Sequence, residues 1–404
     1  MKAGWQTKKL SQVCEKITDG THQTPTYFED GFLFLSSRNV TSGTIDWDNV
    51  KYVDAQQHTD MQKRVSPRLN DILLAKNGTT GVAAIVDRDV PFDIYVSLAL
   101  LRPLTTVLPT FLLHFVNSPI AKSQFTKRLK GIGVPNLHLE EIREVEIAFP
   151  ESLAEQRRIV GILDEAFEGL ATAKANAEQN LQNARALFES HLQAVFTQRG
   201  EGWVEKPLSE LCDIKHGFAF KSEFFATEGD YVLLTPGNFY EIGGYRDRGE
   251  KQKYYAGEIP PDFVLSENDL LVAMTEQAAG LLGSPVLVPE SNKFLHNQRL
   301  GLVTKKPGIP WTNEFFFHVF NTQAVRKEIH DSATGVKVRH TSPTKIGDVV
   351  VSFPTELSRQ RKIVATLKDL REETQRLESL YQRKLAKLDE LKKSLLHRAF
   401  VGEL

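Results

Sequence analysis

Two short polar segments, one in each half of the chain, combine side chains that can hydrogen-bond to the edges of DNA bases. In residues 76–81, lysine, asparagine and threonine offer donors, and two glycines let the backbone approach a ligand closely. In residues 274–277, glutamate could accept from cytosine and glutamine could pair with adenine. The two segments could therefore discriminate different sequences, although a plain hairpin is the alternative for the first. The candidate contacts here are Lys76, Asn77, Thr79, Thr80, Thr275, Glu276 and Gln277.

Basic side chains in three further segments could neutralise phosphates. Residues 122–130 predict a basic amphipathic helix, for which an ordinary solvated helix is the alternative. Residues 131–138 and 335–340 precede the last predicted strand of each half, and Lys337 and Arg339 alternate, so they should share one strand face. The candidate contacts here are Lys127, Arg128, Lys130, Asn136, His138, Lys337, Arg339 and His340.

Patterns that would support catalysis or metal binding are missing from the sequence. The 11 histidines are dispersed, and the closest two, His330 and His340, lack the short spacing of metal ligands on one helix or hairpin. There is no phosphate-binding loop, and no Asn/Asp-Pro-Pro-Tyr/Phe tetrapeptide of the adenine methyltransferases. Cys14 and Cys212 occupy equivalent positions in the two halves, which burial explains best. We predict no catalytic residue, metal site or cofactor in this chain.

Length and composition limit the remaining classes of protein. A chain of 404 residues is too long for one ordinary core, so two or three domains are expected. Its 50 Lys and Arg against 51 Asp and Glu give a net charge of -1, so any basic surface must be local. The longest apolar runs fall short of a membrane span, and the first residues do not resemble a secretory signal. We expect a cytoplasmic protein with no membrane partner.

An internal repeat must position the polar segments. Residues 5–14 and 70–75 return 198 positions later, and residues 111–117 and 149–163 return 204 positions later. The second copy therefore has about six extra residues, which should lie in loops.

Each copy ends in a long segment with no proline and almost no glycine, which predicts a helix. Apolar residues recur every seven positions, as in a coiled coil. The two helices are expected to pair antiparallel within one chain, and a dimerisation segment between two chains is the alternative. The predicted pairing residues are Leu163, Phe167, Leu170, Leu181, Phe188, Leu367, Leu370, Leu377, Leu388, Leu391 and Leu395.

The predicted fold class is α+β, with two similar globular domains of mixed α/β structure, separated by two long antiparallel coiled-coil helices in a pseudo-twofold repeat. The expected boundaries are a first globular domain at 1–155, a first long helix at 156–199, a second globular domain at 200–358 and a second long helix at 359–404.

The combined motifs resemble the specificity subunit of Type I restriction-modification systems over essentially the whole chain. The residues that carry the resemblance are 18–25, 134–137, 155–160, 217–222 and 396–404, together with the two Asn-Asp strands. The resemblance implies two target-recognition domains, each reading one half of a bipartite, asymmetric site on double-stranded DNA.

The resemblance also implies that catalysis belongs to partner chains. Two modification subunits would bring S-adenosylmethionine and methylate adenine, and two restriction subunits would bring ATP and Mg for translocation and cleavage. The loops that match the family's recognition regions are its most variable part, so no base contact is carried over. A coiled-coil scaffold that joins protein partners without DNA is the alternative function.

Overall fold

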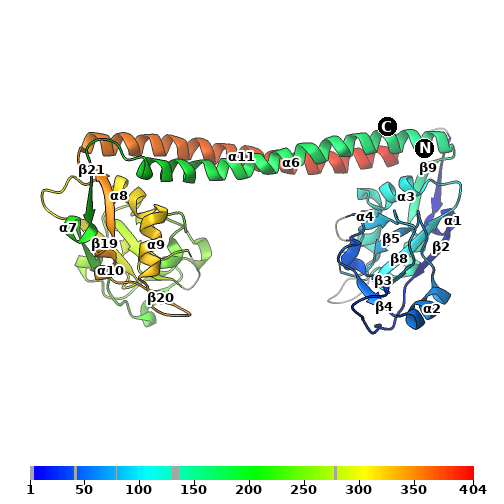
Figure 1. The fold of residues 1–404 in the computed structure, drawn as a ribbon, viewed down its shortest axis with the longest axis horizontal. Helices are drawn as coiled ribbons and strands as arrows, with labels where there is room; N and C mark the ends of the chain where they lie inside the picture. Colours follow the sequence, from blue (N-terminus) through cyan, green and yellow to red (C-terminus); the bar gives the residue numbers. More distant parts are fainter. Residues whose placement is uncertain (1–3, 41–42, 79, 130–135, 277–279) are drawn as a thin grey trace. The chain divides into compact units, whose positions relative to one another are not determined.

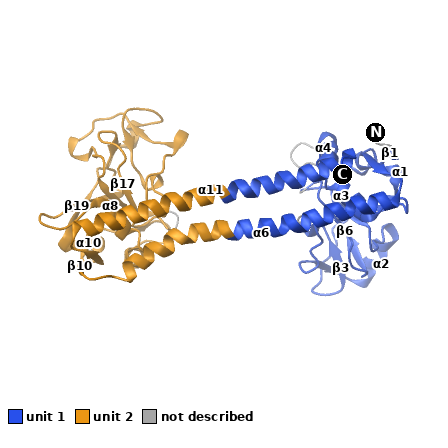
Figure 2. Ribbon diagram, turned by 90° about the horizontal axis from the view of Figure 1, so that it is seen from above, with its two compact units in different colours: residues 1–179, 381–404 blue, residues 180–380 orange. Residues whose placement is uncertain are grey.

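The computed structural model describes residues 4–40, 43–78, 80–129, 136–276 and 280–404. They form two compact units, residues 1–179 with 381–404 and residues 180–380 (Figure 2). Two long helices, α6 (Leu153–Thr197) and α11 (Leu357–Val401), each contribute to both units. None of the described helices has the length and apolar character that crossing a membrane requires.

Unit 1 is built on a four-stranded antiparallel sheet of order β2-β8-β5-β6, with a β1-β9 pair and a mixed sheet of order β4-β3-β7 (Figure 1). Its strands are β1 (Trp5–Lys9), β2 (Cys14–Asp19), β3 (Phe32–Leu35), β4 (Lys51–Val53), β5 (Ile72–Ala75), β6 (Ala83–Ile85), β7 (Phe92–Ile94), β8 (Leu98–Pro103) and β9 (Glu146–Pro150). Its shorter helices are α1 (Leu10–Val13), α2 (Ala55–Arg64), α3 (Pro109–Val116), α4 (Pro119–Arg128) and α5 (Leu139–Arg143).

Unit 2 repeats this plan with the sheet orders β11-β19-β15-β17, β10-β21 and β12-β14-β13-β18, and adds a β16-β20 pair. Its strands are β10 (Trp203–Pro207), β11 (Cys212–His216), β12 (Phe225–Ala226), β13 (Val232–Leu233), β14 (Tyr254–Tyr255), β15 (Leu270–Ala273), β16 (Thr275–Glu276), β17 (Pro285–Leu287), β18 (Phe294–Leu295), β19 (Leu300–Lys305), β20 (Arg339–His340) and β21 (Val350–Pro354). Its shorter helices are α7 (Leu208–Leu211), α8 (Asn313–Phe320), α9 (Gln323–Asp331) and α10 (Pro343–Gly347).

Both faces of strand β5, and of its counterpart β15, are buried. In β5, Ile72 and Leu74 join the core under α3 to α6, whereas Leu73 and Ala75 join a second core with the β4-β3-β7 sheet. The same alternation divides β15 between two cores of unit 2. A strand buried on both faces needs a continuous apolar run, and such a run comes directly after each Asn-Asp pair.

The Asn-Asp pair that opens β5 and β15 has a structural role in both copies. Asn70 and Asn268 have φ of 71° and 67°, in the left-handed region that asparagine tolerates better than most residues. The following carboxylates close the same turn, because Asp71 accepts from the backbone N–H of Arg68 and Asp269 from that of Ser266. The repeated dipeptide therefore sets the entry into a buried strand.

The extra residues of the second copy fall in two connections between equivalent elements. Seven residues, 76–82, connect β5 to β6, whereas eleven, 274–284, which include the short strand β16, connect β15 to β17. The connection from β8 to α3 has five residues, 104–108, and that from β19 to α8 has seven, 306–312. The larger of these two differences in length thus falls in the connection that also carries the candidate base contacts.

Each long helix begins slightly before its predicted start. We expected helices from 156 and 359, but α6 begins at Leu153 and α11 at Leu357. Ser152 caps α6, because its carbonyl accepts from Gln156 N–H and its hydroxyl from Glu155 N–H. Because the cap lies before the first residue of the seven-residue repeat, the helix begins earlier than that repeat predicts.

The two helices pair within the chain and run antiparallel. In unit 1, Leu163 near the start of α6 shares a core with Leu396 and Phe400 near the end of α11. In unit 2, Leu192 near the end of α6 shares a core with Leu367 near the start of α11. The prediction of intrachain pairing is confirmed, and the alternative of a segment that pairs only between chains is wrong for this structure.

The predicted pairing residues are buried to different degrees. Leu163 and Leu367 are fully buried, but Leu391 is 47% exposed, so its prediction is wrong. A straight helix drifts from a strict seven-residue repeat, and toward the end of α11 the buried positions become Leu396, Ala399 and Phe400. Phe188 is also buried, and the half-buried members are Phe167, Leu170, Leu181, Leu370, Leu377, Leu388 and Leu395.

Candidate nucleic-acid interface

In unit 1, the structure brings together residues from three of the segments that the sequence selected separately. The backbone N–H of Leu137 donates to the carbonyl of Lys76 at 2.9 Å, and Asn77 forms a β-bridge with Asn136. Gly81 ends the first segment against Phe125 of α4, the basic helix. Residues 76–78, 80–81 and 136–138 therefore lie beside one another and beside α4, although they are distant in sequence.

Unit 2 contains the same junction at equivalent positions. The N–H of Thr341 donates to the carbonyl of Met274 at 3.0 Å, and β16 pairs with β20 so that Thr275 faces His340 and Glu276 faces Arg339. The repeat relates Lys76 to Met274 and Leu137 to Thr341, so the same backbone contact occurs twice. The side chains on this shared framework differ between the units, and so does the length of the connection that follows β5 and β15.

Lys76 lies in a buried ionic cluster, which differs from the exposed base contact we predicted. Its Nζ donates to Oδ2 of Asp19 at 2.8 Å, and the two side chains are 6% and 3% exposed. Arg64 donates to the other oxygen of Asp19, which also lies 3.2 Å from Nε2 of His22. Lys76 is thus bound by Asp19 because β2 ends beside the loop that follows β5.

The Asp19 cluster forms the floor of a cleft rich in cations. Arg64, His22, His138 and Arg143 line this cleft together with Lys76 and Glu140. Burial alone would raise the pKa of Asp19, but hydrogen bonds from Lys76 and Arg64 lower it below its ordinary value. Asp19 therefore stays ionised and holds the cations in place, and the outer ones, including the half-exposed Arg64, face the cleft.

Sequence reasoning missed Asp19, His22, Arg64 and Arg143 as site residues. Asp19 and His22 stand in the motif at 18–25, but Arg64 ends α2 and Arg143 ends α5, far away in the chain. The available signal was the charged Asp19 within that motif, because a carboxylate that becomes buried on folding needs buried partners.

Glu276 has a structural role in place of the predicted contact with cytosine. Its carboxylate is 3% exposed, and Oε2 accepts from the backbone N–H groups of Gly280, Leu281 and Leu282 at 3.1, 3.0 and 2.9 Å. Three N–H donors converge on one oxygen, so the side chain fixes the end of its own loop. The prediction that Glu276 offers its carboxylate to a base is wrong for this conformation.

Lys337 and Arg339 do not share a strand face, because the strand contains only Arg339 and His340. Arg339 is half-buried, and its Nη2 donates to the carbonyl of His330 at 2.7 Å. Lys337 lies in the preceding turn beside Val336, which is 99% exposed. The exposed candidates at this junction are therefore Lys337 and His340, and Arg339 anchors the turn to α9.

Some side chains of the basic helix, α4, hold it against its neighbours, and others are exposed to solvent. Phe125 is buried in the core, and Arg128 donates to the carbonyls of Gln124 and Glu144, so this arginine ties α4 to its neighbours. Lys127 is exposed. Of the other candidates, Asn77, Thr80, Asn136 and Thr275 are half-exposed and His138 is exposed, and Thr79, Lys130 and Gln277 lie outside the described residues.

Both thiols are poor candidates for nucleophiles. Burial raises the pKa of Cys14 to about 12, and burial followed by the charge of Asp213 raises that of Cys212 to about 12. Within the described ranges, no group of three or more His, Cys, Asp or Glu side chains is placed to hold a metal ion.

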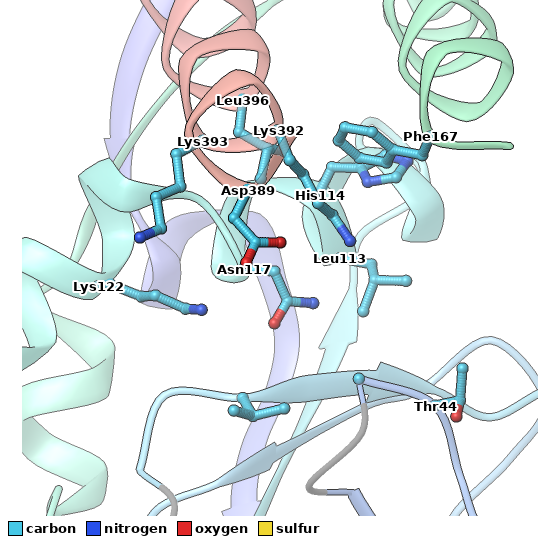
Figure 3. Close-up of a pocket in the computed structure, with 12 residues that line it drawn as sticks. Thr44, Leu113, His114, Asn117, Lys122, Phe167, Asp389, Lys392, Lys393 and Leu396 are labelled. Atoms are coloured by element: carbon cyan, nitrogen blue, oxygen red, sulfur yellow. The ribbon is translucent and has the colours of Figure 1, made fainter. Parts of the chain in front are cut away.

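A second cleft lies in unit 1 between α3, α4 and the last turns of α11 (Figure 3). Lys122, Lys392 and Lys393 line it, with His114 and Asp389 among the other lining residues. Burial, followed by the charges of Lys392 and Lys393, lowers the pKa of Lys122. The cleft is therefore a basic surface built from both a globular element and a long helix.

Unit 2 has a corresponding cleft between α8, α9 and the two long helices. Arg326 there is the repeat equivalent of Lys122, and Arg371 and Glu189 are the equivalents of Phe167 and Lys393. Glu241 and Glu378 also line it, so its charge is mixed. The two clefts share a position in the repeat but differ in charge.

Comparisons with known proteins agree with the repeated plan. The family model described as "Type I restriction modification DNA specificity domain" matches residues 2–182 and 200–385. The chain is 24% identical over 431 residues to the Type I restriction enzyme StySPI specificity subunit of Salmonella potsdam, covering 99% of this chain and 89% of that protein. It is 22% identical over 423 residues to the Type I restriction enzyme EcoKI specificity subunit of Escherichia coli (strain K12), again covering 99% of this chain and 89% of that protein.

Solved structures share the fold. A chain from a structure of the type I R-M system superposes with a TM-score of 0.75 at 19% identity, covering 100% of this chain and 99% of that one. The HsdS subunit from Thermoanaerobacter tengcongensis superposes with a TM-score of 0.66 at 20% identity, covering 100% and 98%.

Proposed function

Because this chain belongs to the Type I restriction modification DNA specificity family, we propose that each of its globular domains reads one half of a bipartite, asymmetric DNA site. The long helices set the spacing between the half-sites and help to dock modification subunits. The chain itself contributes recognition and no catalysis, and it acts in the cytoplasm.

One observation carries the proposal: the same junction occurs in both units with different side chains. Lys76, Asn77 and Asn136 occupy the positions that Met274, Thr275 and His340 occupy in the second unit. The loop after β5 also has seven residues where the loop after β15 has eleven. A constant framework with variable loops is suited to reading two different sequences.

Within unit 1, the cation-rich cleft around Asp19 gives the proposed contacts a phosphate-binding neighbour. Arg64, His22 and Arg143 line the cleft beside the junction of residues 76–77 with 136–137. Phosphate contacts orient a protein on the duplex, and base contacts then specify the sequence. We assign the phosphate role to His22, Arg64 and Arg143 of the cleft and to Lys127, and the base-reading role to Asn77, Thr80, Asn136 and His138. In unit 2, we assign base reading to Thr275 and His340 and a phosphate contact to Lys337.

The clefts beside α11 support docking of two modification subunits. They occupy equivalent positions in the repeat, so one kind of subunit could dock at both. The modification subunits would bind S-adenosylmethionine and methylate adenine, and restriction subunits, if present, would use ATP and Mg. The lysines of the unit 1 cleft would attract acidic side chains of the docked subunit.

The first test is a genome-wide map of N6-methyladenine in the source cell, with this gene intact and with it deleted. We expect one split, asymmetric motif to lose its methylation on deletion. An unchanged map in cells that express the modification subunits would contradict the proposal.

A domain exchange tests the assignment of half-sites. Residues 1–155 are replaced by the matching region of another specificity subunit, and the methylated motif is mapped again. We expect one half of the motif to change and the other half to stay. A change in both halves would show that the two domains do not read independently.

A further inference from the structure

Two ion pairs join α6 to α11, one in each unit. In unit 1, Nζ of Lys174 lies 3.1 Å from Oδ1 of Asp389. In unit 2, Nε of Arg185 lies 3.2 Å from Oε2 of Glu378. In both pairs the cation belongs to α6 and the anion belongs to α11.

The repeat shows that these pairs are two copies of one contact. With the displacement of 204 residues, Lys174 of α6 corresponds to Glu378 of α11, and Arg185 of α6 corresponds to Asp389 of α11. Each position thus has a cation in the first copy and an anion in the second.

Cation–aromatic contacts between α6 and α11 also occur once in each unit. Lys392 lies over the ring of Phe167, 5.0 Å from its centroid, in unit 1, and Arg371 lies over the ring of Phe188 at 4.6 Å in unit 2. Phe167 corresponds to Arg371 and Phe188 to Lys392 in the repeat. Here α6 carries both aromatic rings and α11 carries both cations.

These assignments matter because α6 and α11 share apolar residues at equivalent positions, such as Leu163 with Leu367 and Leu192 with Leu396. If α6 of a second copy took the place of α11 in the same register, Lys174 would face Arg185 and the two cations would repel. If α11 of a second copy took the place of α6, Glu378 would face Asp389 and Arg371 would face Lys392. In either arrangement both ion pairs would become repulsive, whereas both are attractive within the chain.

We propose that this charge pattern selects the partner of each long helix: it directs α6 onto α11 and rejects the same helix of a second copy. The apolar residues buried between the helices stabilise pairing but do not select the partner at shared positions. Leu163 of α6 and its equivalent Leu367 of α11, for example, are both fully buried. Charges at the flanks of a coiled coil often determine pairing in this way. If each domain reads its own half-site, as in the proposed function, the selection keeps two different readers together.

The test exchanges charges in the full chain without altering its net charge. In Lys174→Glu with Glu378→Lys, both ion pairs within the chain become repulsive, and both pairs between identical helices become attractive. The matched control variant, Lys174→Glu with Asp389→Lys, keeps both pairs within the chain attractive. Like the first variant, it makes both pairs between identical helices attractive, so the two variants differ only in the pairs within the chain. Each variant is co-expressed as two copies with different affinity tags, and capture of the second copy and the midpoint of thermal unfolding are measured.

We expect the first variant to capture roughly ten times more of the second copy than the wild type, and to unfold several degrees below the control. The difference between the two variants should shrink in 1 M NaCl, where charges are screened within about 3 Å. Equal capture by the first variant and the control would overturn the proposal. A lower midpoint with no gain in capture would also overturn it, since the pairs would then stabilise without selecting.

A fourfold exchange guards against a misfolded first variant. Lys174→Glu, Arg185→Glu, Glu378→Lys and Asp389→Arg together reverse every charge, so they restore attraction within the chain and repulsion between identical helices. This variant should regain the wild-type midpoint and the low capture of the wild type. Failure to regain them would overturn the proposal. None of these measurements requires DNA, so they are independent of the proposed function.

Discussion

Lys76 places its Nζ 2.8 Å from the Oδ2 of Asp19, in a position where both side chains are buried. A lysine chosen from the sequence as a DNA contact is therefore bound within its own domain. The pair joins the end of β2 to the loop after β5, and it supports the cleft that Arg64 and His22 also line. The shape of this cleft thus depends on an ion pair made inside the domain.

Lys76→Met should lower the free energy of unfolding by about 3 kcal/mol, because it leaves the carboxylate of Asp19 buried with fewer partners. Lys76→Met combined with Asp19→Asn should recover much of this loss, since the uncompensated charge is removed. Urea denaturation measures both. The exposed Lys127→Ala is the control and should change stability by less than about 0.5 kcal/mol. A fully stable Lys76→Met would show that Asp19 does not depend on this lysine.

Glu276→Ala should destabilise unit 2 by roughly 2 to 4 kcal/mol, because three backbone N–H groups lose their common acceptor. Hydrogen exchange should accelerate at Gly280, Leu281 and Leu282. Thr275→Ala, at the neighbouring half-exposed residue, should leave these amides protected. Unchanged protection in Glu276→Ala would contradict the loop-fixing role.

Lys337→Ala and Arg339→Ala should have separable effects. Lys337 is exposed, so its loss should weaken DNA binding by the assembled complex and lower the slope of log affinity against log salt by about one. Arg339 donates to His330, so its loss should lower the thermal midpoint of the chain. Fluorescence anisotropy at several salt concentrations measures the first effect and calorimetry the second. An unaltered salt slope in Lys337→Ala would remove this residue from the phosphate contacts.

Gln156→Ala and Gln360→Ala should each cost about 2 kcal/mol of stability. Both glutamines are fully buried, and Gln156 Nε2 donates to the carbonyl of Pro150 while Gln360 Nε2 donates to that of Pro354, both at 2.9 Å. Each residue thus ties a long helix to the strand before it. Gln198→Ala, at an exposed position after α6, is the control. If either glutamine variant unfolded at the same temperature as the control, that glutamine would not stabilise the contact between helix and strand.

The stability of unit 2 should fall on acidification because of His318. Burial, followed by the charge of Arg371, lowers its pKa from 6.5 to about 4, so the unfolded chain binds a proton that the folded chain does not. The free energy of unfolding is therefore unaffected by His318 above pH 6.5. It falls as the pH drops toward 4, by about 3 kcal/mol at most. Urea denaturation across this range should show a shallower slope for His318→Phe. A slope for His318→Phe identical to that of the wild type would contradict the prediction.

The repeat, the long helices and the fold class could be predicted from the sequence because they depend on local and periodic features. Asn-Asp before an apolar run, the absence of proline over about 40 residues and the seven-residue spacing all act along the chain. The error at Leu391 arose where a strict seven-residue period continued past the point at which the helix had rotated.

The roles of the individual polar side chains depended on partners that the sequence does not reveal. Lys76, Glu276 and Arg339 have the chemistry of DNA contacts, yet Asp19, the amides at 280–282 and His330 occupy them in the folded chain. Hydrogen bonds and ion pairs act over a few ångströms, so burial and neighbours decide them. Composition and periodicity determined that two similar domains and two pairing helices would form. Only the tertiary structure decided which cations stay exposed and which helix charges face each other.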